Sequence, residues 1–282
     1  PVGVVAFCMV ANEGAPANLT NVTIQQARAL WTNGIQKLSL FTGNASDTTY
    51  VFATGRNDGS GTRAVYLSEW GLGVANLVNQ YIATKTGTTS TAVNAITLVP
   101  SNGNGTGTYE TSGAVNASTL WGNTAVGNGG YNSSSSLRTL MGLTSANVTV
   151  YDGENPTPVL ENQNILLLAW VSSAHALTIS NNGGKILSYN GVGVTPITAS
   201  GSYLNSGFSE SDFRKITTGA YSAWSYQHLY YWGSLSANEQ TWYNAMKNTW
   251  IPQGLQSVSN GVKLGDLNVS RPDDGARIVS PL

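Results

Sequence analysis

Several stretches of this chain are almost continuously apolar, which is typical of strands that are covered on both faces of a sheet. The two clearest are residues 2–11 and 165–171. Shorter runs rich in β-branched and aromatic residues predict more strands. They lie at 49–53 and 148–151, with a predicted hairpin of 78–83 and 92–99.

Two helices are marked by capping boxes, in which a Ser or Thr and a Glu or Gln three residues later cap each other's backbone. The box at 23–26 begins an apolar stripe that ends at Gly34. The box at 236–239 begins a second helix, which we expect to stop at Pro252 and Gly254. Because strands and helices alternate along the chain, the pattern predicts an α/β fold.

One polar loop stands between a predicted strand and a predicted helix. It reads Arg56-Asn57-Asp58-Gly59-Ser60-Gly61-Thr62. Its glycines allow a sharp turn and close approach of a ligand, and Ser60 or Thr62 can cap the helix that follows. Free N–H groups at a helix N-terminus, two hydroxyls and a guanidinium suit a small oxyanion such as phosphate. The alternative is a glycine-rich turn before a capped helix, with Arg56 paired to Asp58.

The composition narrows the classes of function. Only 10% of the 282 residues are charged and the net charge is −1, so no basic surface is available to follow a nucleic acid backbone. A surface rich in Gly, Asn, Ser and Thr but poor in charge is common in secreted proteins. The apolar runs are shorter than the ~20 residues that cross a bilayer, so we expect no membrane span.

Residues with catalytic or metal-binding potential are few. The single cysteine, Cys8, lies in a core strand and has no partner for a disulfide. His175 and His228 are isolated in sequence, and we expect each to be a hydrogen-bonded, partly buried side chain. No nucleophile or metal-binding motif is present, so we expect no enzyme, no catalytic residue, no metal and no cofactor. The aromatic cluster between 221 and 232 could stack sugars, but its spacing favours a strand packed on both faces.

Three segments together resemble a known family. Residues 18–34 are similar to a segment with Leu-Thr, a Gln and a short helix before a Gly. Residues 56–62 match an Arg-x-Asp-Gly-Ser-Gly-Thr anion loop, and residues 219–226 are similar to a returning hinge strand, with Tyr-Ser in place of Tyr-Pro. The chain thereby resembles the type II periplasmic (solute-binding) proteins, in particular the phosphate-binding proteins that feed ABC transporters.

The resemblance implies two α/β lobes joined by crossing strands, with the ligand between them. Residues 1–10 would be the outgoing hinge strand, 11–219 the second lobe with the anion loop 56–62, and 220–282 the return hinge strand with the C-terminal part of the first lobe. It assigns oxyanion contacts to Arg56, Ser60, Gly61 and Thr62. Asp58 would hold Arg56 in place or accept a proton from the ligand.

The chain departs from the family at its start. In the family, further strands and a second anion loop precede the outgoing hinge strand, whereas this sequence begins at Pro1. We therefore expect the first lobe to be incomplete in this chain. An incomplete sheet leaves a strand edge unpaired, which invites pairing with another chain.

Two functions follow from these observations. The first is a secreted, periplasmic or extracellular, non-enzymatic solute-binding protein for a small oxyanion such as phosphate, which would deliver its ligand to an ABC transporter. The alternative is an extracellular structural protein that reuses this fold, assembles into filaments or a surface layer through its unpaired strand edge, and keeps a vestigial ligand site.

Overall fold

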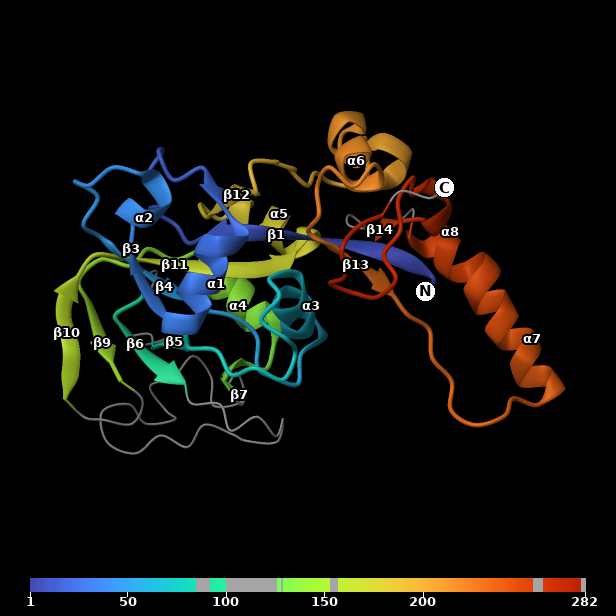
Figure 1. Ribbon diagram of the computed structural model, residues 1–282, viewed down its shortest axis with the longest axis horizontal. Helices are drawn as coiled ribbons and strands as arrows, with labels where there is room; N and C mark the ends of the chain where they lie inside the picture. The colour runs from blue at the N-terminus through green and yellow to red at the C-terminus, as the bar shows by residue number, and fades with distance from the viewer. Residues whose placement is uncertain (85–91, 100–125, 128, 153–156, 256–260, 280–282) are drawn as a thin grey trace.

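The structure is a computed structural model, and it describes residues 1–84, 92–99, 126–127, 129–152, 157–255 and 261–279 (Figure 1). Strands and helices alternate along most of the chain, and the sheets contain both parallel and antiparallel pairs. The predicted α/β class is therefore confirmed. Most of the predicted turn between 84 and 92 and most of the polar stretch 100–135 fall outside the described residues.

The largest sheet is organised around strand β1 (Gly3–Ala11), the first apolar run of the sequence. Its path through the sheet is β2-β12-β1-β11-β4-β3. Pairs β11–β4 and β12–β2 are parallel, while β1 runs antiparallel to both of its neighbours on this path. The other strands of the path are β2 (Asn21–Val22), β3 (Ile35–Lys37), β4 (Tyr50–Ala53), β11 (Ile165–Ser172) and β12 (Lys185–Tyr189).

Strand β1 is shared between two parts of the molecule. Its second half, from Phe7 onward, pairs with β11 and β12. Its first half pairs with β13 (Trp224–Gln227) and β14 (Gly261–Val262), both antiparallel. Figure 1 shows β1 running from the larger body of the molecule into the smaller part that holds β13, β14 and the chain end. The segments predicted to be hinge strands are thus neighbours in one sheet.

A second sheet covers one end of the larger body. Its order is β10-β9-β6-β5. The antiparallel β5–β6 pair confirms the predicted hairpin. The strands are β5 (Gln80–Thr84), β6 (Ala95–Val99), β9 (Val148–Tyr151) and β10 (Pro158–Gln163), with a small separate pair of β7 (Val126–Gly127) and β8 (Gly130–Tyr131).

Helix α1 (Ile24–Asn33) begins where the sequence marks it. The Thr23–Gln26 box caps α1, which ends at Gly34 in the left-handed conformation, as predicted. Short α2 (Ser39–Thr42) and α5 (Ser173–Asn181) are additions that the sequence did not indicate. The others in the described chain are α3 (Gly61–Glu69), α4 (Ser134–Met141), α6 (Glu210–Thr217), α7 (Ala237–Ala245) and α8 (Ile251–Leu255), with short 3-10 turns at Tyr203–Asn205 and Leu264–Asp266.

The last helical stretch corrects one expectation. The Ser236–Glu239 capping box begins α7 as predicted. A π-helical segment, Met246–Trp250, then joins α7 to α8, so the helix passes through Pro252 instead of stopping there. A proline inside a regular helix clashes with the carbonyl four residues earlier, and a wider π turn relieves such crowding. The predicted stop at Pro252 is therefore wrong.

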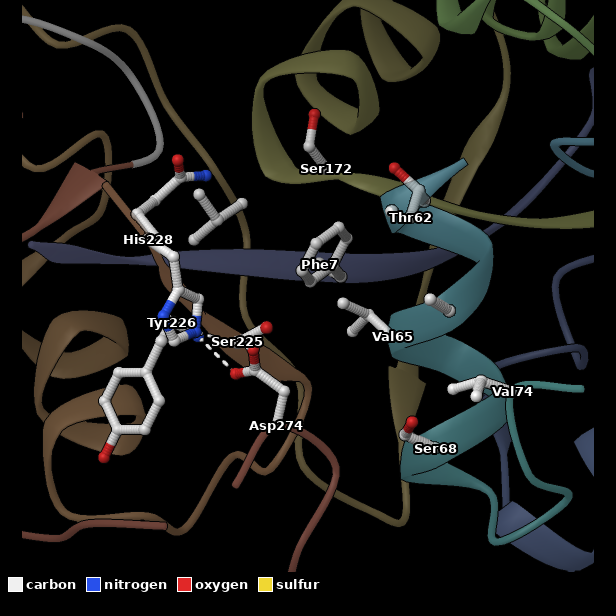
Figure 2. Close-up of a pocket in the computed structure, with 14 residues that line it drawn as sticks. Phe7, Thr62, Val65, Ser68, Val74, Ser172, Ser225, Tyr226, His228 and Asp274 are labelled. Atoms are coloured by element: carbon white, nitrogen blue, oxygen red, sulfur yellow. Dashed lines mark hydrogen bonds and ion pairs between the residues drawn. The ribbon is translucent and has the colours of Figure 1, made fainter. Parts of the chain in front are cut away.

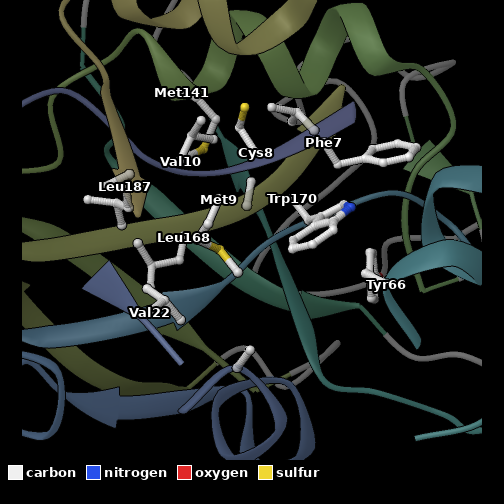
Figure 3. Close-up of a cluster of buried hydrophobic side chains, with 14 of the residues drawn as sticks. Phe7, Cys8, Met9, Val10, Val22, Tyr66, Met141, Leu168, Trp170 and Leu187 are labelled. Atoms are coloured by element: carbon white, nitrogen blue, oxygen red, sulfur yellow. The ribbon is translucent and has the colours of Figure 1, made fainter. Parts of the chain in front are cut away.

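The core lies between the main sheet and its helices. The side chains of β1 and β11 from Phe7 to Val10 and from Ile165 to Val171 are buried, and they pack with Met141, Leu187 and Val22 (Figure 3). Trp170 also meets Trp70 edge to face, with ring centroids 5.6 Å apart. Because Trp70 follows α3 directly, this contact fixes α3 against the sheet. Cys8 is fully buried, as predicted.

Candidate functional site

Two helices begin at the same edge of the main sheet. Strands β4 and β11 are parallel neighbours, and Leu168 of β11 lies opposite Ala53, the last residue of β4. Beyond β4 the chain passes through the predicted anion loop into α3, and beyond β11 it enters α5 directly. The carboxyl ends of parallel strands are where open α/β sheets bind ligands. The loop therefore stands at the edge that the topology favours for a site.

A cavity of about 620 Å³ opens beside the first turns of α3. Its floor is β1, where Val5 and Phe7 face it (Figure 2). One wall consists of α3 from Gly61 to Ser68 together with Ser172, and the facing wall carries the side chains of β13 and of the segment around Asp274. Polar groups thus line both walls, while the floor is apolar.

The first turn of α3 borders this cavity. The amide of Ser60 donates to the Asn57 carbonyl at 3.1 Å, and the amide of Ala64 donates to the Ser60 carbonyl at 3.0 Å. Within the described chain, no backbone carbonyl accepts the amides of the three residues between them, Gly61, Thr62 and Arg63. These are the unsatisfied N–H groups of a helix N-terminus, which carry a partial positive charge. Ser60 occupies the capping position but makes no capping bond.

Arg56 has a different environment from the one predicted. Its Nε donates to the Tyr131 carbonyl at 3.1 Å, one Nη donates to the Asn132 carbonyl at 3.2 Å, and the other donates to the Ser134 hydroxyl. Partial burial lowers the pKa of the guanidinium from its usual value. Three of its five N–H groups are thus engaged by the segment from β8 to α4. Arg56 supports the loop and does not line the cavity.

Of the five predicted contact residues, Gly61 and Thr62 border the cavity, whereas Arg56, Asp58 and Ser60 do not. Ser60 is buried and Asp58 is partly buried. The side chain of Gln80 forms hydrogen bonds with the loop that carries them and with α3. The Gln80 amide nitrogen donates to the Arg56 carbonyl at 3.0 Å, and its oxygen accepts from Tyr66 at 2.6 Å.

The facing wall holds a pair that the sequence did not reveal. His228 Nε2 lies 2.9 Å from one Asp274 oxygen, and the other oxygen accepts the Tyr226 amide at 2.9 Å. The His228 ring stacks on Tyr230, with centroids 5.4 Å apart. His228 is hydrogen-bonded, as predicted, but the residue is exposed and its partner lies 46 residues away in sequence. No local pattern could have found this pair.

Two serines on the cavity wall add hydroxyls. Ser172 precedes α5 and lies on the same side as Thr62 (Figure 2). Its hydroxyl is 3.4 Å from His175 Nδ1, and burial lowers the pKa of His175, which keeps that ring neutral. Ser225 on β13 is buried and lines the facing wall of the cavity. The cavity therefore offers donors from three elements.

A buried ion pair ties the far end of α3 to the segment that carries Asp274. Arg271 Nη1 lies 2.9 Å from Glu69 Oε2, and both side chains are almost completely buried. The Arg271 guanidinium also lies 4.4 Å above the Trp224 ring. Ser222 donates to the second Glu69 oxygen at 2.7 Å. The two walls of the cavity are thereby linked by one polar network.

Several kinds of site receive no support from the described residues. No three His, Cys, Asp or Glu side chains in that part of the chain are grouped as metal ligands. Among its helices, none combines the length and apolar character needed to cross a bilayer. No family model and no curated protein matches the sequence. The function of the chain is therefore inferred from the geometry of the cavity.

Proposed function

We propose that the chain is a secreted, non-enzymatic solute-binding protein that holds a small oxyanion such as phosphate at the start of α3. The observation that carries the proposal is that Gly61 and Thr62, whose amides have no backbone acceptor in the described chain, line a cavity. A helix N-terminus with free donors favours an anion through both hydrogen bonds and the helix dipole. Such contacts bind the ligand without changing it chemically.

Hydroxyl groups complete the coordination in this proposal. Thr62 and Ser172 donate from the α3 and α5 side, and Ser225 supplies a buried hydroxyl from β13. Direct contact from Arg56 requires that its bonds to the Tyr131 and Asn132 carbonyls be exchanged for bonds to the anion. In the geometry described, Arg56 instead supports the loop through its bonds to the Tyr131 and Asn132 carbonyls.

The arrangement of the strands supports a two-lobed, type II solute-binding architecture as part of the same proposal. Strand β1 runs from the larger body into the smaller part, where β13 pairs with it antiparallel. The cavity lies beside these two strands, where lobes joined by them would close on a ligand. In this arrangement β1 is the outgoing strand and β13 the returning strand, and an ABC transporter would receive the ligand.

The test is a calorimetric titration with phosphate and with sulfate. A matched pair of variants isolates the backbone donor. Gly61 is the first helical residue of α3 and a Cβ there meets no atom within 4 Å, so both Ala and Pro fit. Gly61→Ala keeps the N–H and should bind like the unaltered protein. Gly61→Pro removes only that N–H.

A charge-assisted hydrogen bond contributes about 1.5–3 kcal/mol, so Gly61→Pro should weaken phosphate binding about 10-fold to 150-fold. The absence of binding heat from phosphate and sulfate would refute the proposal. Equal affinity of the two variants would place the anion elsewhere.

The competing function is an extracellular structural protein that assembles into filaments or a surface layer. One observation favours it specifically: the Arg56 donors are engaged by the protein's own carbonyls and Ser134. A site used in this way is vestigial. Filaments or sheets in electron micrographs, together with no phosphate binding, would support this function over the first.

A further inference from the structure

The helical stretch that begins at Ala237 contacts the smaller part of the molecule at its C-terminal end, beside the start of β1. Residues 237–255 form one continuous helix from α7 through the π-helical segment to α8, here called the terminal helix. Neither α7 nor the π-helical segment contains a buried residue. Figure 1 shows the terminal helix projecting away from both sheets. A helix without a buried face gains little stability from packing, because tertiary contacts supply most helical stability.

Five large aromatic side chains are exposed on this helix and on the segment that leads to it. Their exposed fractions run from 46% for Trp250 to 99% for Trp232. The rings cluster across the two segments: Tyr231 and Tyr243 have centroids 5.1 Å apart, as do Trp242 and Trp250. We call the exposed set the aromatic face. It consists of Tyr230, Tyr231, Trp232, Trp242 and Trp250.

The area of the aromatic face matches that of a protein interface. A Trp or Tyr buries about 150–250 Å² when it is fully covered, so five rings that are half to wholly exposed offer roughly 600–800 Å². A standard interface covers about 800 Å² on each partner. Contiguous apolar patches of this size mark interaction sites.

The charges on this stretch are self-complementary. Between residues 229 and 255 the charged residues are Glu239 and Lys247, which lie eight positions apart on the helix. In an antiparallel pair of identical helices centred on Tyr243, Glu239 of each copy faces Lys247 of the other. Two opposite charge pairs then flank the aromatic rings. We propose that the aromatic face is the interface of a homodimer, formed by antiparallel packing of two terminal helices.

Two other occupants fit these observations less well. A platform for sugars needs open ring faces, whereas Trp242 and Trp250 meet each other edge to face at 74°, and Tyr231 meets Tyr243 at 77°. A helix lying on an anionic membrane is rich in Lys and Arg, but the terminal helix carries Lys247 alone. A second copy supplies both an apolar surface and the complementary charge.

The dimer inference does not rest on the proposed oxyanion site, although Tyr230 of the aromatic face stacks on His228, which lines the cavity. The cavity is lined by residues outside the terminal helix. The interface pairs the same surface on both copies, so it closes after two chains and does not propagate as a filament does. Loss of phosphate binding would leave this inference untouched, and a monomeric protein would leave the oxyanion proposal untouched.

The experiment measures mass in solution by light scattering and by analytical ultracentrifugation. The unaltered chain should have twice the 29.6 kDa mass of one copy at tens of micromolar. Trp242→Ala with Trp250→Ala should give a monomer with unchanged phosphate binding. Leu77→Ala is the matched control, because Leu77 is equally exposed and distant in sequence from the aromatic face. This control variant should remain a dimer.

Charge reversal tests the antiparallel register directly. Lys247→Glu and Glu239→Lys each place like charges opposite each other, so each variant alone should be monomeric. When the two variants are mixed, the Lys247→Glu chain carries two acidic residues and the Glu239→Lys chain carries two basic residues. A heterodimer of the two variants should then form. Circular dichroism of each variant checks that the helix persists without the Glu239 cap.

If the unaltered chain is a monomer at 100 µM, the inference is overturned. The same holds if the monomeric chain binds insoluble polysaccharide or lipid vesicles through the aromatic face. A dimer that survives loss of both tryptophans would also overturn it. Failure of the mixed charge variants to associate would refute the antiparallel register.

Discussion

The ion pair between Glu69 and Arg271 should be among the most costly polar contacts to break. Their side chains are 7% and 1% exposed, and the pair joins α3 to the segment that carries Asp274. Replacing Arg271 with Met keeps most of the side-chain volume but leaves the Glu69 carboxylate buried. Breaking a buried pair from one side costs about 3–5 kcal/mol, because the remaining charge has lost its partner.

A double-mutant cycle separates the pair from its surroundings. Arg271→Met and Glu69→Leu should each lower the free energy of unfolding by about 3–5 kcal/mol, whereas the double variant should lose far less. The loss of unfolding free energy for Glu69→Leu should lie toward the lower end of this range, because Arg271 keeps its bond to the Ser222 carbonyl and its contact with Trp224. Urea unfolding followed by tryptophan fluorescence measures all four proteins.

The chain supplies a matched control in α6. Arg214 and Glu210 form an ion pair at 2.6 Å whose side chains are both more than half exposed. Exposed pairs of this kind contribute little to stability, because water and salt screen the two charges. Arg214→Met should therefore be nearly neutral. If Arg271→Met lowers the free energy of unfolding no more than Arg214→Met does, the network does not stabilise the link between the two cavity walls.

Three other perturbations test the loop, the core and the first helix. A Cβ on Gly130 would lie 2.7 Å from the Gly55 carbonyl oxygen, so Gly130→Ala should destabilise the fold by about 1–3 kcal/mol in urea unfolding, while Gly61→Ala is neutral. Burial raises the pKa of the Cys8 thiol from 9.0 to about 12, so the unfolded chain loses this proton first. Stability should fall between pH 9 and 12, by up to about 1.4 kcal/mol per pH unit from this group, and Cys8→Ala should flatten the slope measured by urea unfolding at several pH values. Thr23→Ala removes the cap of α1 and should cost about 1 kcal/mol of stability, measured by thermal unfolding.

Features that depend on neighbouring residues were predictable from the sequence. The capping box at Thr23 needs only a side chain and an amide three residues later, and the structure contains it. The apolar run of β11 has no polar alternation, and both its faces are buried. The position of the anion loop between β4 and α3 follows from the same local signals.

Features that depend on distant residues were not predictable. Arg56 has carbonyls available 75 and 76 residues away, and these acceptors decide whether its guanidinium faces a ligand or the protein. The His228–Asp274 pair has the same origin, since its members meet only after β13 and the chain end pack beside β1. A motif specifies which donors are present, but the acceptors that compete for them come from the rest of the fold.

The aromatic stretch at 230–232 shows why burial is harder to predict than periodicity. Its spacing favoured a strand covered on both faces, yet β13 ends at Gln227 and these rings are exposed. The sequence requires that such rings be covered, because leaving several hundred Å² of apolar surface in water is unfavourable. It does not specify whether the cover belongs to the same chain. In the proposed dimer a second copy of the chain supplies this cover, so the mass in solution is the first property to measure.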